Sequence, residues 1–311
     1  MKKIVLAGGS GFAGSILAKH FHQQVYDVVI LSRNPKLYSP FARHVKWNGE
    51  EVNSWKEELE NAEAVINLSG RTVNCRYNAK NKKEILESRV NATTAIGQAI
   101  QQCQHPPKVW MNASSATIYG YSLDKDMPES APTVAYDFST TICHEWEKAF
   151  YSFSTPQSRK IALRISMILG NHPHSVITVL KRLVRFGLGG KMGNGKQYVS
   201  WIHESDFANA VTLLLQRNDL SGPFNLVAPG LITNKDFMRT IRKEMGIPIG
   251  IGAMEWMLEI GAMVIRTETE LILKSRRAVP EKLLQAGFQF RFPDPTSAIH
   301  NLIMKNRHGN H

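Results

Sequence analysis

The chain has 311 residues, of which 43% are hydrophobic and 21% charged, values typical of a folded protein with one large domain or two modest ones. Its formal charge is +12, but the basic residues are spread along the chain and form no nucleic-acid recognition motif, so we expect no nucleic-acid partner. The three cysteines show no CxxC spacing, which argues against a disulfide framework or a zinc site and favours a reducing, cytoplasmic compartment.

The first element is a strand, "KIVLA" at residues 3–7, which runs directly into the glycine-rich turn "GGSGFAG" and a helix expected at about 13–23. Glycines at this junction permit a positive φ, close approach of a pyrophosphate and tight packing of helix on strand, while the helix N-terminus attracts the phosphates. Because strand, glycines and helix occur in that order, we predict dinucleotide binding. The contacts expected in this turn are Gly8, Ser10, Gly11, Phe12 and Gly14.

The second strand, "DVVILS" at residues 27–32, ends in Ser32 and Arg33 instead of the acidic residue that bonds the ribose of NAD. A guanidinium can pair with the 2′-phosphate of NADP, so this position favours NADP(H); the alternative is an arginine at a loop tip in water.

Further strands are expected at about 62–70, 108–115 and 160–166, separated by helices at about 81–102 and 140–152. Strict alternation of strand and helix predicts an α/β fold with a doubly wound parallel sheet of the Rossmann type. The first of these helices begins close to a basic cluster, Lys80, Lys82 and Lys83 after Arg71 and Arg76, which is either a solvated face or a rim that attracts phosphate.

After Gly170 the pattern changes to a glycine-rich segment, a helix, a strand at about 223–229 and a mostly helical C-terminal region. We expect residues 1–170 plus about 201–228 to form the nucleotide-binding domain, and about 171–200 plus 229–311 to form a smaller capping domain that closes a cleft over a small-molecule substrate. The apolar stretch at 251–265 is too short for a membrane span and carries two glutamates. It predicts an amphipathic helix packed on the core or on a partner subunit, as in a homodimer, and no membrane partner.

Several motifs together resemble one known family. "GGSGFAG", "LSRNP", "NLSG", "KKEILESRVNAT", "LRISMILG", "GLGGKMGNGKQYVSWIH" and "VPEKLLQAGFQFRFPD" occur in this order from Met1 to the C-terminal region. They are similar to the YfcH-like epimerase family of atypical short-chain dehydrogenases/reductases. The resemblance implies an extended short-chain dehydrogenase fold with a small C-terminal domain.

The same resemblance implies particular cofactor contacts. Ser32 and Arg33 match the contact to the NADP phosphate, and the turn after "AVIN" matches the segment that lies against the adenosine. The further positions that match are Asn67, Leu68, Gly70, Glu84, Arg89, Asn91 and Ser114. From the residues alone, Glu84 and Arg89 would be an exposed pair on a helix.

Extended short-chain dehydrogenases use a tyrosine as acid/base with a lysine one helical turn later. In "DFSTTICHEWEKAF", Glu147 aligns with the glutamate that follows this pair, which puts Ser139 at the tyrosine position and Cys143 at the lysine position. Neither residue can perform the usual role, so a proton would have to come from another group or from ordered water.

Three residues are candidates for the missing chemistry. In "NASSATIYG", Ser114 or Ser115 matches the usual serine, and Tyr119 is either a proton donor or a packed aromatic in the pocket wall. His203 has an intrinsic pKa suited to acid/base work, with a hydrogen-bonded histidine at the domain junction as the alternative. Asp206 is expected to cap the helix that follows.

Other side chains give weaker signals. Asn74 and Arg76 either face the cleft or lie at its rim in water, and the remaining histidines, including His172 and His174, lack the spacing of a metal site.

The sequence therefore predicts an NADP(H)-binding epimerase- or reductase-like oxidoreductase of unknown substrate, without the Tyr-Lys pair. The competing hypothesis is a non-catalytic NADP-binding redox sensor or regulatory protein, because a fold does not establish a reaction.

Overall fold

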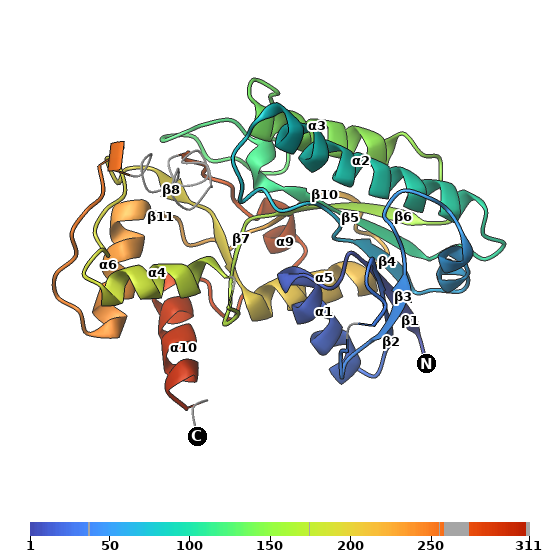
Figure 1. Cartoon of the computed structure of the whole chain (residues 1–311), viewed down its shortest axis with the longest axis horizontal. Helices are drawn as coiled ribbons and strands as arrows, with labels where there is room; N and C mark the ends of the chain where they lie inside the picture. The colour runs from blue at the N-terminus through green and yellow to red at the C-terminus, as the bar shows by residue number, and fades with distance from the viewer. Residues whose placement is uncertain (37, 174, 255, 258–273, 309–311) are drawn as a thin grey trace.

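The computed structural model describes residues 1–311 except residues 37, 174, 255, 258–273 and 309–311. Its centre is a seven-stranded sheet in which every neighbouring pair of strands is parallel, in the order β10-β6-β5-β4-β1-β2-β3 (Figure 1). The strands are β1 Lys3–Ala7, β2 Asp27–Ser32, β3 Arg43–Lys46, β4 Ala64–Asn67, β5 Val109–Ser115, β6 Arg159–Ile165 and β10 Gly222–Leu226. The predicted doubly wound Rossmann fold is thereby confirmed.

Both faces of this sheet are covered by helices, as a parallel sheet requires. Successive residues of a strand point to opposite faces, so Ile4 and Leu6 of β1 join one buried cluster and Val5 and Ala7 join another. Helices α2 (Ala79–Gln101) and α3 (Phe138–Tyr151) cover one face, whereas α1 (Phe12–Gln23) and α5 (Glu204–Gln216) cover the other (Figure 1).

Local signals explain where the two long helices begin. The side chain of Asn78 caps α2 by accepting a hydrogen bond from the backbone N–H of Asn81. Asp137 and Thr140 form a reciprocal capping box at the start of α3, and Asp137 also forms an ion pair with Lys274 from the C-terminal region. The N-terminal end of α3 is therefore tied to a segment more than a hundred residues away in the chain.

A second group of elements has its own buried core beside the sheet. It contains α4 (Val176–Arg185), α6 (Asn234–Met245) and α10 (Pro295–His308), with the short paired strands β7 (Met167–Leu169) and β9 (Trp201–His203), and β8 (Tyr198–Val199) and β11 (Ile232–Thr233). In Figure 1 these helices lie at the opposite end of the molecule from β1, β2 and β3.

Part of the C-terminal region departs from the expected domain limits. Leu283 of α9 (Glu281–Gln285) and Phe288 pack into the core beneath the sheet, although the sequence assigned both to the capping domain. Two short 3-10 helices, η1 (Ser54–Leu59) and η2 (Ala116–Ile118), complete the elements that bear on the site. The helix expected at 251–265 falls largely outside the described residues, as does His174.

Candidate functional site

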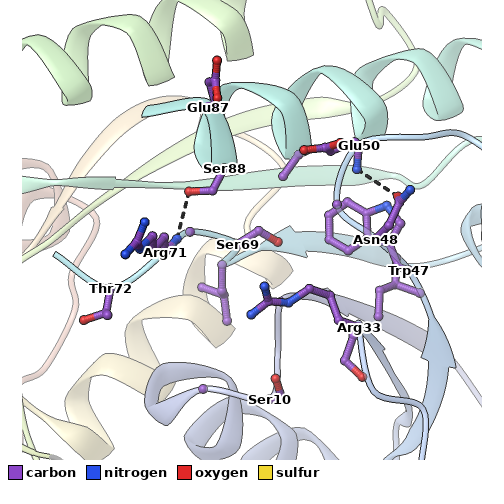
Figure 2. A pocket seen from close by; sticks show the side chains of 18 of the residues that line it. Ser10, Arg33, Trp47, Asn48, Glu50, Ser69, Arg71, Thr72, Glu87 and Ser88 are labelled. Atoms are coloured by element: carbon purple, nitrogen blue, oxygen red, sulfur yellow. Dashed lines mark hydrogen bonds between the residues drawn. The ribbon is translucent and has the colours of Figure 1, made fainter. Parts of the chain in front are cut away.

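A cavity of about 580 Å³ opens at the carboxyl ends of β1, β2, β3 and β4. This position is where the strand order of a doubly wound sheet reverses, because β4 and β2 lie on opposite sides of β1. Gly8, Ser32 and Leu68 contribute to its floor and walls from the ends of three strands, and α2 covers it from above (Figure 2).

The glycine-rich turn is shaped by two close approaches. Gly8 has φ +70°, and a Cβ at this position would lie 2.6 Å from the Ser69 hydroxyl oxygen. A Cβ on Gly14 would lie 2.2 Å from the carbonyl oxygen of Gly9, so only glycine lets α1 pack this closely on the turn. The amino end of α1, at Gly11 and Phe12, is therefore brought to the edge of the cavity, where its partial positive charge favours an anion.

Arg33 extends from the end of β2 into the cavity, between Ser10 and Ser69 in Figure 2. Its neighbour Ser32 is buried, and its hydroxyl donates to the carbonyl oxygen of Asn34 at 3.0 Å and contacts His44 Nδ1 at 3.3 Å. Ser32 thus fixes the turn, while the exposed guanidinium of Arg33 is left to meet a ligand.

The rim opposite Arg33 is built by the loop after β4 and by α2. The Ser88 hydroxyl accepts a hydrogen bond from the Arg71 backbone N–H at 2.9 Å (Figure 2), and Arg71 forms an ion pair with Glu84. Trp47 and Asn48, which follow β3, form the far wall, with Trp47 packed on Trp55 at 5.4 Å between ring centroids. The sequence does not predict that these two residues line the cavity, because β3 is a short strand with little apolar alternation.

The structure brings many of the predicted cofactor residues together around this cavity. Those that line it are Gly8, Ser10, Gly11, Ser32, Arg33, Leu68, Gly70 and Glu84. Phe12, Gly14, Asn67, Arg89, Asn91 and Ser114 do not line it.

Phe12 and Asn67 have other positions and roles. Phe12 lines a second, more open cavity of about 890 Å³ beside α1. Asn67 is fully buried; its amide nitrogen donates to Asn112 Oδ1 at 2.7 Å and its oxygen accepts from the Ser69 backbone N–H at 3.0 Å. Asn67 therefore shapes the turn from below.

Ser139 and Cys143, which the family resemblance aligns with a tyrosine and a lysine, lie on one face of α3. Ser139 and Cys143 are buried and one helical turn apart, and the Cys143 thiol donates to the Ser139 carbonyl oxygen at 3.3 Å. Burial raises the pKa of the Cys143 thiol to about 12, so it stays neutral near physiological pH.

Arg89 of α2 lies against the same face of α3. Its guanidinium stacks over the Trp146 ring at 5.0 Å from the centroid and donates to the carbonyl oxygens of Arg71 (3.0 Å) and Ile85 (2.9 Å). The indole N–H of Trp146 donates to the Thr93 hydroxyl. Thr93 lies one turn after Arg89 on α2, and Trp146 lies about one turn after Cys143 on α3. Arg89 therefore sits level with Cys143. A positive charge is thus held beside the position that a lysine usually occupies.

A buried polar network lies behind this face. The Ser114 hydroxyl donates to Glu147 at 2.7 Å, and Glu147 accepts two hydrogen bonds of 2.9 Å from Arg164. Arg164 also donates to the Tyr119 hydroxyl at 2.8 Å, and that hydroxyl donates to Asn225 Oδ1 at 2.8 Å.

This network bears on the alternatives left open for Ser114 and Tyr119. The Ser114 proton is engaged by Glu147 inside the protein, and the neighbouring Ser115, whose hydroxyl bonds Thr117 at 2.9 Å, is the less buried member of the pair. Tyr119 is fully buried, and burial raises the pKa of its phenol. Its position favours the packed-aromatic alternative over a proton donor.

His203 and Asp206 hold the junction between the two cores. His203 is fully buried against Phe292, at 4.0 Å between ring centroids, and its Nδ1 accepts from the Ser205 backbone N–H at 3.1 Å. These contacts favour the junction alternative for His203. The expectation that Asp206 caps α5 is wrong, because His203 occupies that position and Asp206 instead accepts the backbone N–H groups of Arg291 and Phe292, each at 2.9 Å.

Glycine turn, parallel sheet and cavity at the strand ends together define a dinucleotide-fold protein of the short-chain dehydrogenase/reductase type. The NAD dependent epimerase/dehydratase family matches residues 4–227, and the domain of unknown function DUF1731 matches residues 255–302. The chain belongs to the NAD dependent epimerase/dehydratase family, and its resemblance to the atypical epimerase-like members is confirmed.

Individual relatives cover almost the whole chain. The epimerase family protein YfhF of Bacillus subtilis is 33% identical over 96% of this chain and 97% of its own length. The epimerase family protein SSP1921 of Staphylococcus saprophyticus is 30% identical over 97% of this chain and 100% of its own length. The crystal structure of human epimerase family protein SDR39U1 (isoform 2) with NADPH is 26% identical, covers 97% of this chain and 99% of its own, and superposes with a TM-score of 0.86.

No helix in the described part of the chain combines the length and the apolar character needed to cross a bilayer. No group of three His, Cys, Asp or Glu side chains in the same part of the chain is arranged to hold a metal ion.

Proposed function

We propose that the protein binds NADP(H) in the cavity at the carboxyl edge of the sheet and acts on an unidentified substrate as an atypical epimerase or reductase. The observation that carries the proposal is Arg33, which reaches into the cavity from the end of β2 where an NAD-binding protein would present a carboxylate. The likeness to SDR39U1, whose structure contains NADPH, supports this cofactor.

The residues present fit the adenosine half of the cofactor. The guanidinium of Arg33 would pair with the 2′-phosphate, and the amino end of α1 would meet the pyrophosphate. The Asn48 Oδ1 atom accepts hydrogen bonds from the backbone N–H groups of Glu50 and Glu51. Its amide nitrogen donates to Glu51 Oε2 at 3.1 Å and would have a second N–H for the adenine edge.

The nicotinamide half would extend toward the end of β5 and the amino end of α3. There Arg89 would supply the positive charge that the lysine supplies elsewhere, and the hydroxyls of Ser115 and Thr117 would position a substrate oxygen. When bound, the cofactor supplies a hydride or accepts one. Because Tyr119 and His203 are buried and engaged, we assign the accompanying proton to ordered water.

The second candidate function is a non-catalytic NADP-binding sensor or regulator. It is favoured by Ser139 and by Cys143, whose neutral, buried thiol cannot replace a lysine. The three cysteines are free, which fits a reducing compartment, and we place either function in the cytoplasm.

Hydride transfer separates the two functions. The wild-type protein is incubated with NADPH deuterated at the transferable position and a panel of carbonyl compounds, and separately with NADP+ and a panel of nucleotide sugars. A reductase places deuterium in a product, which mass spectrometry detects, whereas an epimerase oxidises the sugar, returns the same hydride and yields the inverted sugar, which NMR detects. Ser115→Ala slows either reaction while leaving NADPH affinity within about twofold. Saturable NADPH binding with neither reaction would favour the sensor.

A further inference from the structure

Helix α4 and the loop that follows it lie in a stretch with one sign of charge. Residues 171–203 contain five basic side chains, Lys181, Arg182, Arg185, Lys191 and Lys196, and no carboxylate. Arg182 and Arg185 are exposed, and within the described part of the chain neither forms an ion pair. Lys181 is buried, so the positive surface of this stretch is formed by the exposed side chains of Arg182, Arg185, Lys191 and Lys196.

The same stretch exposes large apolar side chains. The inward side of α4 is buried through Ile177, Leu180 and Val184, so the helix already has an apolar contact with its core. Its outward side nevertheless carries Val176 (44% exposed) and Val179 (46%), and Phe186 just beyond the helix is 80% exposed. Packing among the residues that the structure describes does not account for these outward side chains.

A second segment extends this surface. The backbone N–H of Ile251 donates to the Gly187 carbonyl oxygen at 2.7 Å, and the Gly190 N–H donates to the Ile251 carbonyl oxygen at 3.0 Å. Ile251 (61% exposed) and Ile249 (73%) are thereby held beside Phe186 and Leu188 (48%). We call this surface the α4 face; it consists of Val176, Val179, Arg182, Arg185, Phe186, Leu188, Ile249 and Ile251.

The α4 face lies far from the nucleotide cavity. In Figure 1, α4 and the segment after α6 are at one end of the molecule, and β1, β2 and β3 are at the other. A partner on this face would therefore leave the cavity between β2 and α2 open.

We propose that the α4 face docks on an anionic lipid bilayer. Exposed valine, isoleucine and phenylalanine side chains insert at the boundary of headgroups and acyl chains, and flanking arginines attract the lipid phosphates. A second copy of the chain would bring two unpaired basic surfaces together, and nucleic acid would gain nothing from the apolar side chains. The helix lies on the bilayer and does not span it, which revises the expectation of no membrane partner.

Vesicle sedimentation of the full chain tests this inference without reference to catalysis. Binding is measured on neutral phosphatidylcholine vesicles and on vesicles containing phosphatidylglycerol, for the wild type, Val179→Asp/Phe186→Asp, Arg182→Gln/Arg185→Gln and a control, Leu284→Asp. Leu284 is 50% exposed on α9, away from the α4 face. Circular dichroism melts establish that each variant is folded.

The wild type and Leu284→Asp are expected to bind anionic vesicles and to ignore neutral ones. The aspartate pair should abolish binding, and loss of both arginines should weaken it by roughly twenty-five-fold, because each basic side chain near an anionic surface contributes about a factor of five. Absence of binding to anionic vesicles would overturn the proposal. So would a wild-type dimer in sedimentation velocity that the aspartate pair converts to monomer, since the α4 face would then be a contact between copies.

Discussion

At the scale of single residues, two arginines, Arg33 and Arg89, occupy different parts of the candidate site. Arg33 extends into the cavity from the end of β2, whereas Arg89 is held by Trp146 and by two carbonyl oxygens near Cys143. The two guanidiniums should therefore report on different halves of the same ligand.

Arg89→Met is expected to weaken NADPH binding by about tenfold and to leave 2′,5′-ADP binding unchanged, because in the proposed binding mode only the nicotinamide half would approach α3. Arg33→Ala should weaken both ligands. Competition calorimetry measures these affinities, with Lys83→Met as an exposed control on α2. Equal losses of both ligands in Arg89→Met would show that Arg89 serves the adenosine half instead.

At the scale of elements, the polar network behind α3 connects strands and helices that are far apart in sequence. Glu147 of α3 pairs with Arg164 of β6 through two hydrogen bonds of 2.9 Å and also accepts from Ser114 of β5. Both partners of the ion pair are almost entirely buried.

Glu147→Gln should destabilise the protein by about 3–5 kcal/mol, because it leaves the Arg164 guanidinium buried without its counter-charge. Urea unfolding measures the loss. Glu145→Gln is the matched control on the same helix, since the Glu145–Lys148 pair is exposed and should contribute less than about 1 kcal/mol. If both substitutions had the same small effect, the network would be more hydrated than the contacts indicate.

Sequence alone predicts the elements whose signals are local. The turn from Gly8 to Gly14 and the Ser32-Arg33 end of β2 are short contiguous patterns, so their roles can be inferred without a structure. The sequence leaves Ser114 and Ser115 as alternatives, because neighbouring strand residues face opposite sides and the pattern does not reveal which of the two faces inward.

Contacts over long sequence distances could not be predicted. The Glu147–Arg164 pair and the packing of Phe288 beneath the sheet depend on how distant segments meet.

At the scale of the whole molecule, the two cores are joined by a few buried polar contacts. The Asp206 carboxylate is fully buried and holds the backbone of Arg291 and Phe292, while Phe292 packs on His203. This arrangement ties α5, which covers the sheet, to the chain that leads into α10.

Asp206→Ala is expected to lower the free energy of unfolding by about 2–5 kcal/mol, because two buried backbone N–H groups lose their acceptor. Asp206→Asn should cost less, since one amide oxygen remains to accept. Chemical denaturation measures both, with Asp219→Ala as a control on an exposed carboxylate. A stable Asp206→Ala protein would mean that water satisfies the two N–H groups.

The central claim, that Arg33 makes the cavity an NADP(H) site, is tested most directly by calorimetric titration of NADPH and NADH into the wild type, Arg33→Ala and Lys36→Ala, a neighbouring exposed cation. We expect the wild type and Lys36→Ala to bind NADPH at least tenfold more tightly than NADH, and Arg33→Ala to lose most of this preference, as for one charge-assisted phosphate contact. Equal affinity of the wild type for the two cofactors, or a preference that survives in Arg33→Ala, would contradict it.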